Sequence, residues 1–347
     1  HLSIRRQRQM CIRDSLRADV PIGSALSGGL DSSSIVSYIN ILLKKENKTD
    51  LQKTFSSCSE DPRYDERSWM EEVVKETLVD GHYVYPKGED VFKLTEKLIW
   101  FMDEPYQSQS AFLGYHVFME AKKNNVVVLL NGQGADEYLS GYGAYKSIRQ
   151  NNMINKFEFK KLYAEINQPR SFIRLILVSI LNKFPSVKQK INSNGQFKSV
   201  INQKILGAKS EILNYYNNNC HLDISKIQLL VDPLPRYLRW EDRNSMAHSV
   251  EARVPFLDYR LIEYIHSLPL DYLDAPHQSK HILVEALKGI LPEKVRNRKD
   301  KKGFITPEQK WFMSEFCDEF IKLFEDNVKY ARGIINKEEG IKYLNNM

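Results

Sequence analysis

The feature that most constrains the fold is a turn rich in glycine and serine, Ser27–Ser33, between two regular segments. A strand-like apolar run, Val20 to Leu26, precedes it, and a helix-like run begins at Leu30. Gly28 and Gly29 allow positive φ and close approach of the backbone to a ligand, while free amides at the helix start supply donors to an anion. Further donors come from the hydroxyls of Ser27, Ser32 and Ser33. The pattern predicts a phosphate-binding turn.

The turn differs from the loop of P-loop ATPases. No Gly-Lys-Ser/Thr follows after four intervening residues, so the lysine that grips the γ-phosphate there is missing. Asp31 lies inside the predicted cradle, where its carboxylate would repel phosphate unless a divalent cation bridged the two. This favours a magnesium ion bound to Asp31. The alternative is that Asp31 only complements the helix dipole and that the glycines only form a turn.

Strand-like and helix-like segments alternate along the first 130 residues. The expected strands are Ile22 to Ser27, Thr54 to Cys58, His82 to Tyr85 and Val126 to Leu130. The expected helices run from Leu30 to Leu43, Asp65 to Leu78, Val91 to Phe101 and Phe112 to Lys123. The wholly apolar run at Val126 to Leu130 is typical of a central parallel strand. We therefore expect an α/β fold with a doubly wound parallel sheet, and a ligand site beyond the carboxyl ends of its strands.

The chain is long enough, at 347 residues with 42% hydrophobic content, to bury one large core or two modest ones. Residues 16–150 are expected to form the nucleotide-binding core, residues 151–233 a helical insertion rich in Asn, Lys and Gln, and residues 234–347 a helical layer. Residues 1–15 are expected to be a non-native or disordered leader, because Met10–Ser15 looks like translated sequencing adapter.

Charge and cysteine content narrow the function classes. The net charge of +6 is mild and spread along the chain, so no nucleic-acid partner is expected. A basic run from Lys294 to Lys302 is either a solvated surface or an arm that reaches toward phosphates. The four cysteines form no Cys-x-x-Cys pair, which argues against structural zinc and disulfides and favours a reducing cytoplasm. The longest apolar stretch, Phe172 to Leu181, is interrupted by Arg174 and is too short to span a membrane.

A second turn, Asn131–Glu137, directly follows the apolar strand. Gly132 and Gly134 would let a nucleotide lie against the backbone, and Asp136 would be a second carboxylate for magnesium, approaching Asp31 from a neighbouring strand. The alternative is that Asp136 only caps a helix.

A third block, Tyr237–Asp258, places Leu238, Asp242, Ser245, Ser249 and Arg253 at steps of three or four residues. On this spacing one helical face carries acid, hydroxyls and base, and Arg253 suits a carboxylate or phosphate. The alternative is a structural network of ion pairs among Asp242, Arg243, Glu251 and Arg253.

These three blocks and the segment Arg296–Phe304, in this order, resemble the synthetase domain of glutamine-dependent asparagine synthetases, which belong to the ATP pyrophosphatases. The likeness covers about residues 16 to 310. It implies an ATP pyrophosphatase fold with a helical C-terminal layer, and ATP and Mg²⁺ as cofactors. It also implies that aspartate is converted to asparagine through β-aspartyl-AMP, with ammonia as the nitrogen donor. Asp103–Pro105, with Ser108 and Ser110, resembles a loop that borders the same site.

The resemblance also implies roles for particular residues. Lys299 would steady the phosphates and the developing negative charge, and Gln133 would position substrate. ATP and pyrophosphate would be bound by Ser27, Gly28, Gly29, Leu30, Asp31, Ser32, Ser33, Ser57, Asn131, Gly132 and Asp136, with magnesium on Asp31 and Asp136. The acid substrate would be bound by Glu137, Asp242, Arg243, Glu251 and Arg253.

Two departures from the family pattern matter. Gln133 occupies a place where some relatives carry a glutamate implicated in proton handling, and an amide cannot act as a base near neutral pH. No N-terminal glutaminase domain precedes residue 16, and Cys11 lacks the glycine expected after that domain's nucleophile. The chain is therefore expected to use free ammonia or a partner's glutaminase, or to be a truncated gene product.

Two other functions stay open. One is a related adenylating amidotransferase or a ligase similar to the β-lactam synthetases, which acts on another acid. The other is a non-catalytic nucleotide-binding relative. The sequence does not decide the oligomeric state, and a homodimer stays open.

Overall fold

The computed structural model describes residues 12–45, 52–166, 168–181, 221–273, 275, 278–300, 303, 306–331 and 333–345. The chain divides into two compact units, one of His1–Gly143 with His221–Glu308 and one of Ala144–Cys220 with Gln309–Met347. This division differs from the expected domains. Residues 221–233, expected in the insertion, belong to the first unit, and residues 309–347, expected to cover the sheet, belong to the second.

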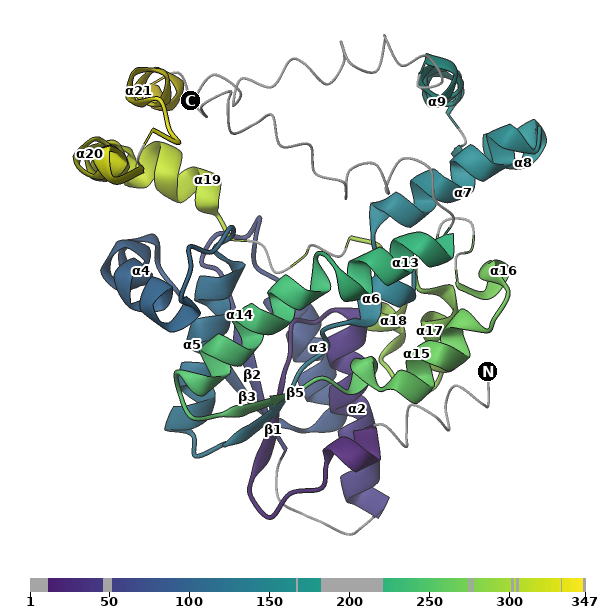
Figure 1. The fold of residues 1–347 in the computed structure, drawn as a ribbon. Helices are drawn as coiled ribbons and strands as arrows, with labels where there is room; N and C mark the ends of the chain where they lie inside the picture. The colour runs from purple at the N-terminus through teal and green to yellow at the C-terminus, as the bar shows by residue number, and fades with distance from the viewer. Residues whose placement is uncertain are drawn as a thin grey trace. The chain divides into compact units, whose positions relative to one another are not determined.

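The first unit is built on a five-stranded parallel sheet in the order β3-β2-β1-β4-β5, which confirms the predicted fold class (Figure 1). Its strands are β1 (Ile22–Ala25), β2 (Lys53–Ser57), β3 (Asp80–Val84), β4 (Val128–Leu130) and β5 (Glu251–Arg253). The first four lie within the segments expected from the sequence or within two residues of them.

The apolar run before Asn131 is buried on both faces of the sheet. Val128 and Leu130 belong to one hydrophobic cluster, and Leu129 belongs to the other. This is the period-two alternation of a central strand with cores on both sides. β4 pairs with β1 in the register Ser24 to Leu130. Since both strands run in the same direction, the turns that follow them emerge at the same edge of the sheet.

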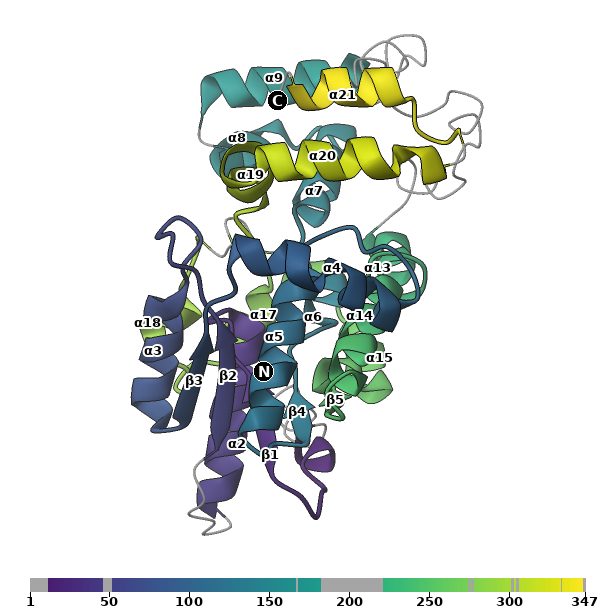
Figure 2. The same cartoon turned by 90° about the vertical axis from the view of Figure 1, so that its left-hand side faces the viewer.

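Helices cover both faces of the sheet (Figures 1 and 2). On one face α2 (Leu30–Lys45) packs with α3 (Arg67–Thr77) and α18 (Glu293–Arg296). On the other, α5 (Ser110–Lys123) packs on β2, α14 (Leu234–Met246) packs on α5, and α4 (Gly88–Met102) packs on α14. The further helical segments of this unit are α6 (Ala135–Tyr138), α13 (His221–Leu230), η2 (Pro255–Leu257), α15 (Tyr259–His266), α16 (Leu270–Leu273) and α17 (His281–Ala286).

The described part of the second unit is helical. Its elements are α7 (Gly143–Asn155), α8 (Phe159–Ile166), α9 (Pro169–Leu181), α19 (Glu308–Lys310), η3 (Trp311–Glu315), α20 (Cys317–Asn327), η4 (Val328–Ala331) and α21 (Lys337–Asn345), of which α7 and α19 begin at the unit boundaries. Inside it, Glu165 accepts hydrogen bonds from Arg149 at 2.8 Å and from Gln150 at 3.0 Å.

Two expectations require correction. The helical face predicted from Leu238 to Arg253 is wrong, because α14 ends at Met246, Ser249 has a φ of 53°, and Glu251–Arg253 pairs with β4 as a strand. The second concerns the leader. Residues 1–11 lie outside the described residues, but Ile12 is 1% exposed and belongs to the larger core cluster, so residues 12–15 are part of the fold.

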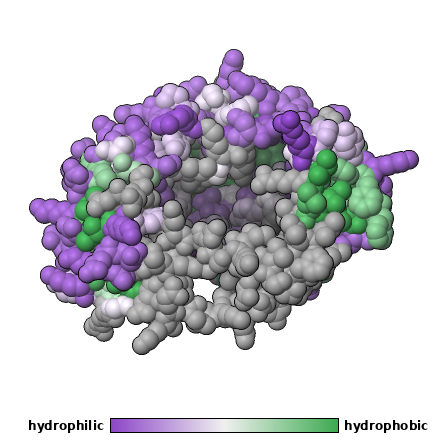
Figure 3. Space-filling view, turned by 90° about the horizontal axis from the view of Figure 1, so that it is seen from above, coloured by the Kyte–Doolittle hydropathy of each residue, from purple (hydrophilic) through white to green (hydrophobic). Residues whose placement is uncertain are grey.

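Within the described part of the chain, no helix combines the length and the apolar character needed to cross a membrane. Seen from above, the described residues present a largely hydrophilic surface with smaller apolar areas (Figure 3).

Candidate functional site

A cavity of about 500 Å³ lies in the first unit, beyond the carboxyl ends of β1, β2 and β4. This is where a doubly wound sheet places its ligand. Phe55, Val117, Phe118 and Trp240 line it with apolar surface, and polar groups from both predicted turns line it elsewhere. The predicted site residues that line it are Ser27, Asp31, Ser32, Ser57, Asn131, Gly132, Gln133 and Asp136.

The Ser27–Ser33 turn is held by its own hydroxyls. Ser27 donates its backbone N–H to Ser32 Oγ at 3.1 Å, and the two hydroxyl oxygens lie 3.0 Å apart. Gly28 has a φ of 68°, and a Cβ there would lie 2.6 Å from Trp69 Cβ. Only glycine meets both conditions without strain. The turn therefore presents its hydroxyls to the cavity in a fixed arrangement.

The second turn touches the first. A Cβ added to Gly132 would lie 3.0 Å from the backbone nitrogen of Ser32 and 3.1 Å from Asp31 Cβ. Glycine is needed here for close approach rather than for φ. As a result, the turns that follow β1 and β4 border one shared space.

A buried lysine joins the two turns. Lys280 Nζ lies 2.6 Å from Asp31 Oδ2 and 2.7 Å from Asp136 Oδ1, and its side chain is 4% exposed. Lys280 precedes α17 with a φ of 52°, a conformation that costs a residue other than glycine about 1 kcal/mol. The two ion pairs offset this cost. Such left-handed residues often mark functional positions.

The two aspartates suit magnesium only in combination with other oxygen ligands. In the described residues no group of three or more His, Cys, Asp or Glu side chains is arranged to hold a metal ion by itself. However, Asp31 and Asp136 lie within reach of one cation, since both contact the same ammonium group. Magnesium is commonly held by one or two carboxylates together with substrate phosphates. The two aspartates fit that arrangement once a triphosphate supplies the remaining oxygens.

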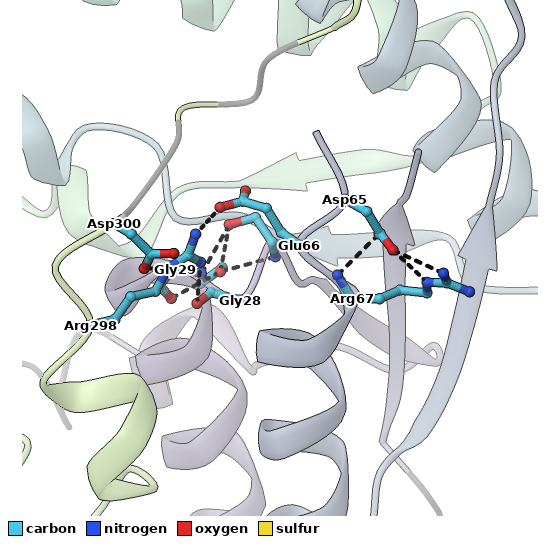
Figure 4. Close-up of polar contacts among 9 residues, drawn as sticks. Gly28, Gly29, Asp65, Glu66, Arg67, Arg298 and Asp300 are labelled. Atoms are coloured by element: carbon cyan, nitrogen blue, oxygen red, sulfur yellow. Dashed lines mark hydrogen bonds and ion pairs between the residues drawn. The ribbon is translucent and has the colours of Figure 1, made fainter. Parts of the chain in front are cut away.

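Arg298 holds the Ser27–Ser33 turn in place through its backbone. Its guanidinium donates to the Gly28 carbonyl at 3.2 Å and also bonds the Glu66 carboxylate, while its side chain is only 4% exposed (Figure 4). It lies 4.7 Å from the ring centroid of Trp69, the residue that the Gly28 backbone contacts. Figure 4 shows Arg298 directed at the starts of α2 and α3. One buried cation thus connects both helix starts to the segment after α18.

The side of α14 that faces the cavity differs from the side that the sequence predicted. Tyr237, Trp240, Glu241 and Asn244 line the cavity, at steps of three and four residues. Asn244 donates to the Ala111 carbonyl at 2.7 Å, which fixes α14 against α5. Asp242, which the prediction chose, is exposed.

Several predicted residues do not line the cavity. Arg243 pairs with Asp103 at 2.8 Å, and Arg253 pairs with Glu251 at 2.7 Å. Arg253 also donates to the Ser15 and Arg17 carbonyls, which lie at the start of the chain. Lys299 is exposed. The geometry thus favours ion pairing for Arg243 and Arg253, the alternative left open for this block.

Glu137 is buried behind the cavity wall. It is 1% exposed, and the Tyr142 hydroxyl donates to its Oε1 at 2.8 Å. Burial raises the pKa of both Glu137 and Tyr142. Tyr142, rather than Glu137, lines the cavity. In the first turn, Gly28, Gly29, Leu30 and Ser33 form the backbone of the cradle without lining the space itself.

Lys280 was missed because no motif surrounds it, and its contacts depend on residues about 250 and 140 positions away in the chain. Trp240 and Glu241 could have been predicted from the sequence as cavity residues. Their spacing with Tyr237 and Asn244 defines an alternative helical face with the same period.

Comparisons with known proteins relate the chain to one family. A family model described as asparagine synthase matches residues 3–345. The chain is 29% identical to the glutamine-hydrolyzing asparagine synthetase 1 of Bacillus subtilis, over 95% of this chain and 51% of that protein. It is 25% identical to the amidase chry2 of Gibberella zeae, over 89% of this chain and 52% of that protein. The chain spans about half the length of the curated relatives it matches.

Among solved structures, an NMN synthetase from Francisella tularensis aligns with a TM-score of 0.28 and 13% identity. The alignment covers 73% of this chain and 98% of that one.

Proposed function

The chain belongs to the asparagine synthase family, and from this premise we propose that it is an ATP-dependent ligase that converts aspartate to asparagine. The observation that carries the proposal is the meeting of Asp31 and Asp136, from turns that follow neighbouring parallel strands, at one buried cation in one cavity. The name of the Bacillus subtilis relative supports aspartate as the acid.

The proposed first step is attack of the aspartate β-carboxylate on the α-phosphorus of ATP. A bond forms between a carboxylate oxygen and phosphorus, and the bond from the α-phosphorus to the bridging oxygen breaks, with that oxygen leaving on pyrophosphate. In the second step ammonia attacks the carbonyl carbon of β-aspartyl-AMP, and AMP leaves with the carboxylate oxygen. Both steps build negative charge on phosphate, which fixed donors stabilise.

Different residues of the cavity lining are proposed to contact different parts of ATP. Phe55, Val117 and Phe118 offer apolar surface for adenine, and Ser57 stands at the end of β2 beside them. Ser27 and Ser32 offer hydroxyl donors to the departing pyrophosphate. Asp31 and Asp136 would hold magnesium, which supplies charge neutralisation for the leaving group.

Lys280, and not Lys299, is proposed to steady the phosphates and the developing negative charge. It is already in contact with both aspartates, so its ammonium can contact phosphate oxygens with a small movement of a flexible stem. Arg236 and Tyr237 line the cavity from α14 and are proposed to meet the acid substrate. Gln133, which also lines the cavity, would position it.

Nitrogen is proposed to enter as ammonia. The chain spans about half of relatives whose names specify glutamine hydrolysis, so a glutaminase on another segment or on a partner is the second source. Ammonium alone is expected to support the reaction in either case.

The proposed function predicts which acid drives ATP cleavage. With ATP, magnesium and ammonium present, aspartate is expected to give AMP, pyrophosphate and asparagine in equal amounts, measured by chromatography and an enzyme-coupled pyrophosphate assay. Asp31→Asn is expected to lower the rate at least 100-fold, because it weakens the magnesium site. Asp326→Asn, which changes an exposed carboxylate in the second unit, serves as the matched control.

Other outcomes separate the alternatives. If a different acid drives ATP cleavage, the protein is a related adenylating ligase with another substrate. The similarity to the amidase chry2 supports this alternative. ATP binding without AMP formation for every acid in the panel would make it a non-catalytic relative.

A further inference from the structure

Glu241 is a buried carboxyl group on the cavity-facing side of α14. It is 7% exposed and lines the cavity together with Gln133. Neither of its carboxyl oxygens has a hydrogen-bond partner of ordinary geometry among the described residues, although Asn131 lies close enough to act on it. A buried carboxyl without a full set of partners is costly, and such groups call for a functional explanation.

The other carboxylates that line the cavity are already committed to cations. Asp31 and Asp136 contact Lys280, and Glu66 bonds Arg298. Gln133 is an amide and takes no proton near neutral pH. Among the described residues that line the cavity, Glu241 is therefore the carboxyl group placed to exchange a proton.

The surroundings of Glu241 suit that task. Burial raises the pKa of its carboxyl to about 8, and the Asn131 amide offsets part of the effect. A carboxyl in this range can accept a proton and hold it at neutral pH. The charged and titratable groups that line the same cavity are Asp31, Glu66, Asp136, Tyr142, Arg236 and Tyr237.

We propose that Glu241 is the proton acceptor of the amide-forming step. This inference rests on the proposed adenylating function. When the nitrogen nucleophile attacks the carbonyl carbon of the acyl-adenylate, its nitrogen becomes positively charged. The Glu241 carboxylate takes one proton from that nitrogen and becomes a neutral carboxylic acid. The carbon–oxygen bond to AMP then breaks, AMP leaves with the electron pair, and the proton later returns to solvent.

The test separates the two half-reactions. Exchange of labelled pyrophosphate into ATP, driven by the acid substrate, reports adenylation. Hydroxamate formation with hydroxylamine reports the amide-forming step. Glu241→Gln keeps the size of the side chain. It is expected to slow hydroxamate formation about 100-fold, which is the effect of losing a general base. The rate of pyrophosphate exchange is expected to stay within about threefold of the parent's rate. Glu241→Asp is expected to stay at least tenfold faster than Glu241→Gln, and the exposed Glu263→Gln is the matched control.

The pH profile gives a second readout that a structural role would not produce. Hydroxylamine is uncharged from about pH 7 upward, so its own titration does not shape the curve. Hydroxamate formation by the parent protein is expected to rise with pH and to level off above the apparent pKa of about 8, because the carboxylate is the active form. Glu241→Gln is expected to lose that rise.

Three results would contradict the inference. They are a Glu241→Gln variant with the parent's hydroxamate rate, a variant that loses exchange and hydroxamate formation equally, and a Glu241→Asp variant as slow as Glu241→Gln. Absence of exchange in the parent protein with every acid would instead overturn the proposed function, and this inference with it.

Discussion

Replacing Lys280 with methionine is expected to slow acid-dependent pyrophosphate release about 1000-fold, equivalent to about 4 kcal/mol of lost transition-state stabilisation. Its ammonium is the cation that both aspartates contact, at 2.6 and 2.7 Å. Methionine keeps the length and the apolar stem of the side chain but removes the charge. Without that charge, the negative charge of the leaving pyrophosphate is less well compensated. Steady-state pyrophosphate release at saturating ATP measures the effect.

Stability requires a separate control, because the substitution leaves two carboxylates facing each other with little solvent. Removing one partner of a buried ion pair costs about 3–5 kcal/mol. The double variant Lys280→Met/Asp136→Asn relieves that repulsion and is expected to fold more stably than Lys280→Met, yet to stay inactive. The exposed Lys75→Met is the matched control.

Lys299→Met decides between the two lysine assignments. Because Lys299 is exposed and does not line the cavity, its loss is expected to lower pyrophosphate release less than fivefold. A large loss in Lys299→Met together with a rate above one tenth of the parent's in Lys280→Met would reverse the assignment.

Arg298→Met is expected to lower the free energy of unfolding by about 3 kcal/mol and to raise the KM for ATP. The substitution removes four contacts of one buried guanidinium, to Glu66, to Asp300, to the Gly28 carbonyl and to the face of Trp69. The Glu66 carboxylate, whose side chain is 11% exposed, would lose its cation. The Gly28 carbonyl would lose the donor that fixes the Ser27–Ser33 turn. Urea denaturation gives the stability, and initial rates at varied ATP give the KM.

Pairing the substitution with Glu66→Gln separates charge from packing. If the buried charge dominates, Arg298→Met/Glu66→Gln is expected to recover more than half of the lost stability, because neither charge then lies buried alone. Arg298→Lys is expected to fall between the parent and Arg298→Met, since an ammonium cannot reach all of these partners at once. Stability of Arg298→Met within 0.5 kcal/mol of the parent would contradict this view of the turn.

Much of the sheet was predictable because its signals are local. The apolar run before Asn131 and the alternation of strand-like and helix-like segments placed β1 to β4 within two residues of their observed ends. β5 was missed, since Glu251–Arg253 is only three residues long, contains two charged residues and follows a helix with little separation. Its pairing with β4 depends on tertiary context, which overrides local propensity in short strands.

The two turns of the site were predictable for the same reason, since each joins a strand to a helix within a few residues. The residues that close the site were harder to find. Lys280 has no local signature, and the polar face chosen on the third block does not line the cavity. Helical periodicity alone does not tell which of two faces meets the core when both carry polar side chains.

The fate of the carboxylate oxygen distinguishes attack on the α-phosphorus from other routes of ATP cleavage. Aspartate labelled with ¹⁸O in its side-chain carboxylate is incubated with the protein, ATP, magnesium and ammonium, and the AMP is analysed by mass spectrometry. If the carboxylate attacks the α-phosphorus in the cavity of Asp31, Asp136 and Lys280, each AMP carries one ¹⁸O atom and pyrophosphate carries none. Unlabelled AMP, or label found in inorganic phosphate beside ADP, would contradict the account.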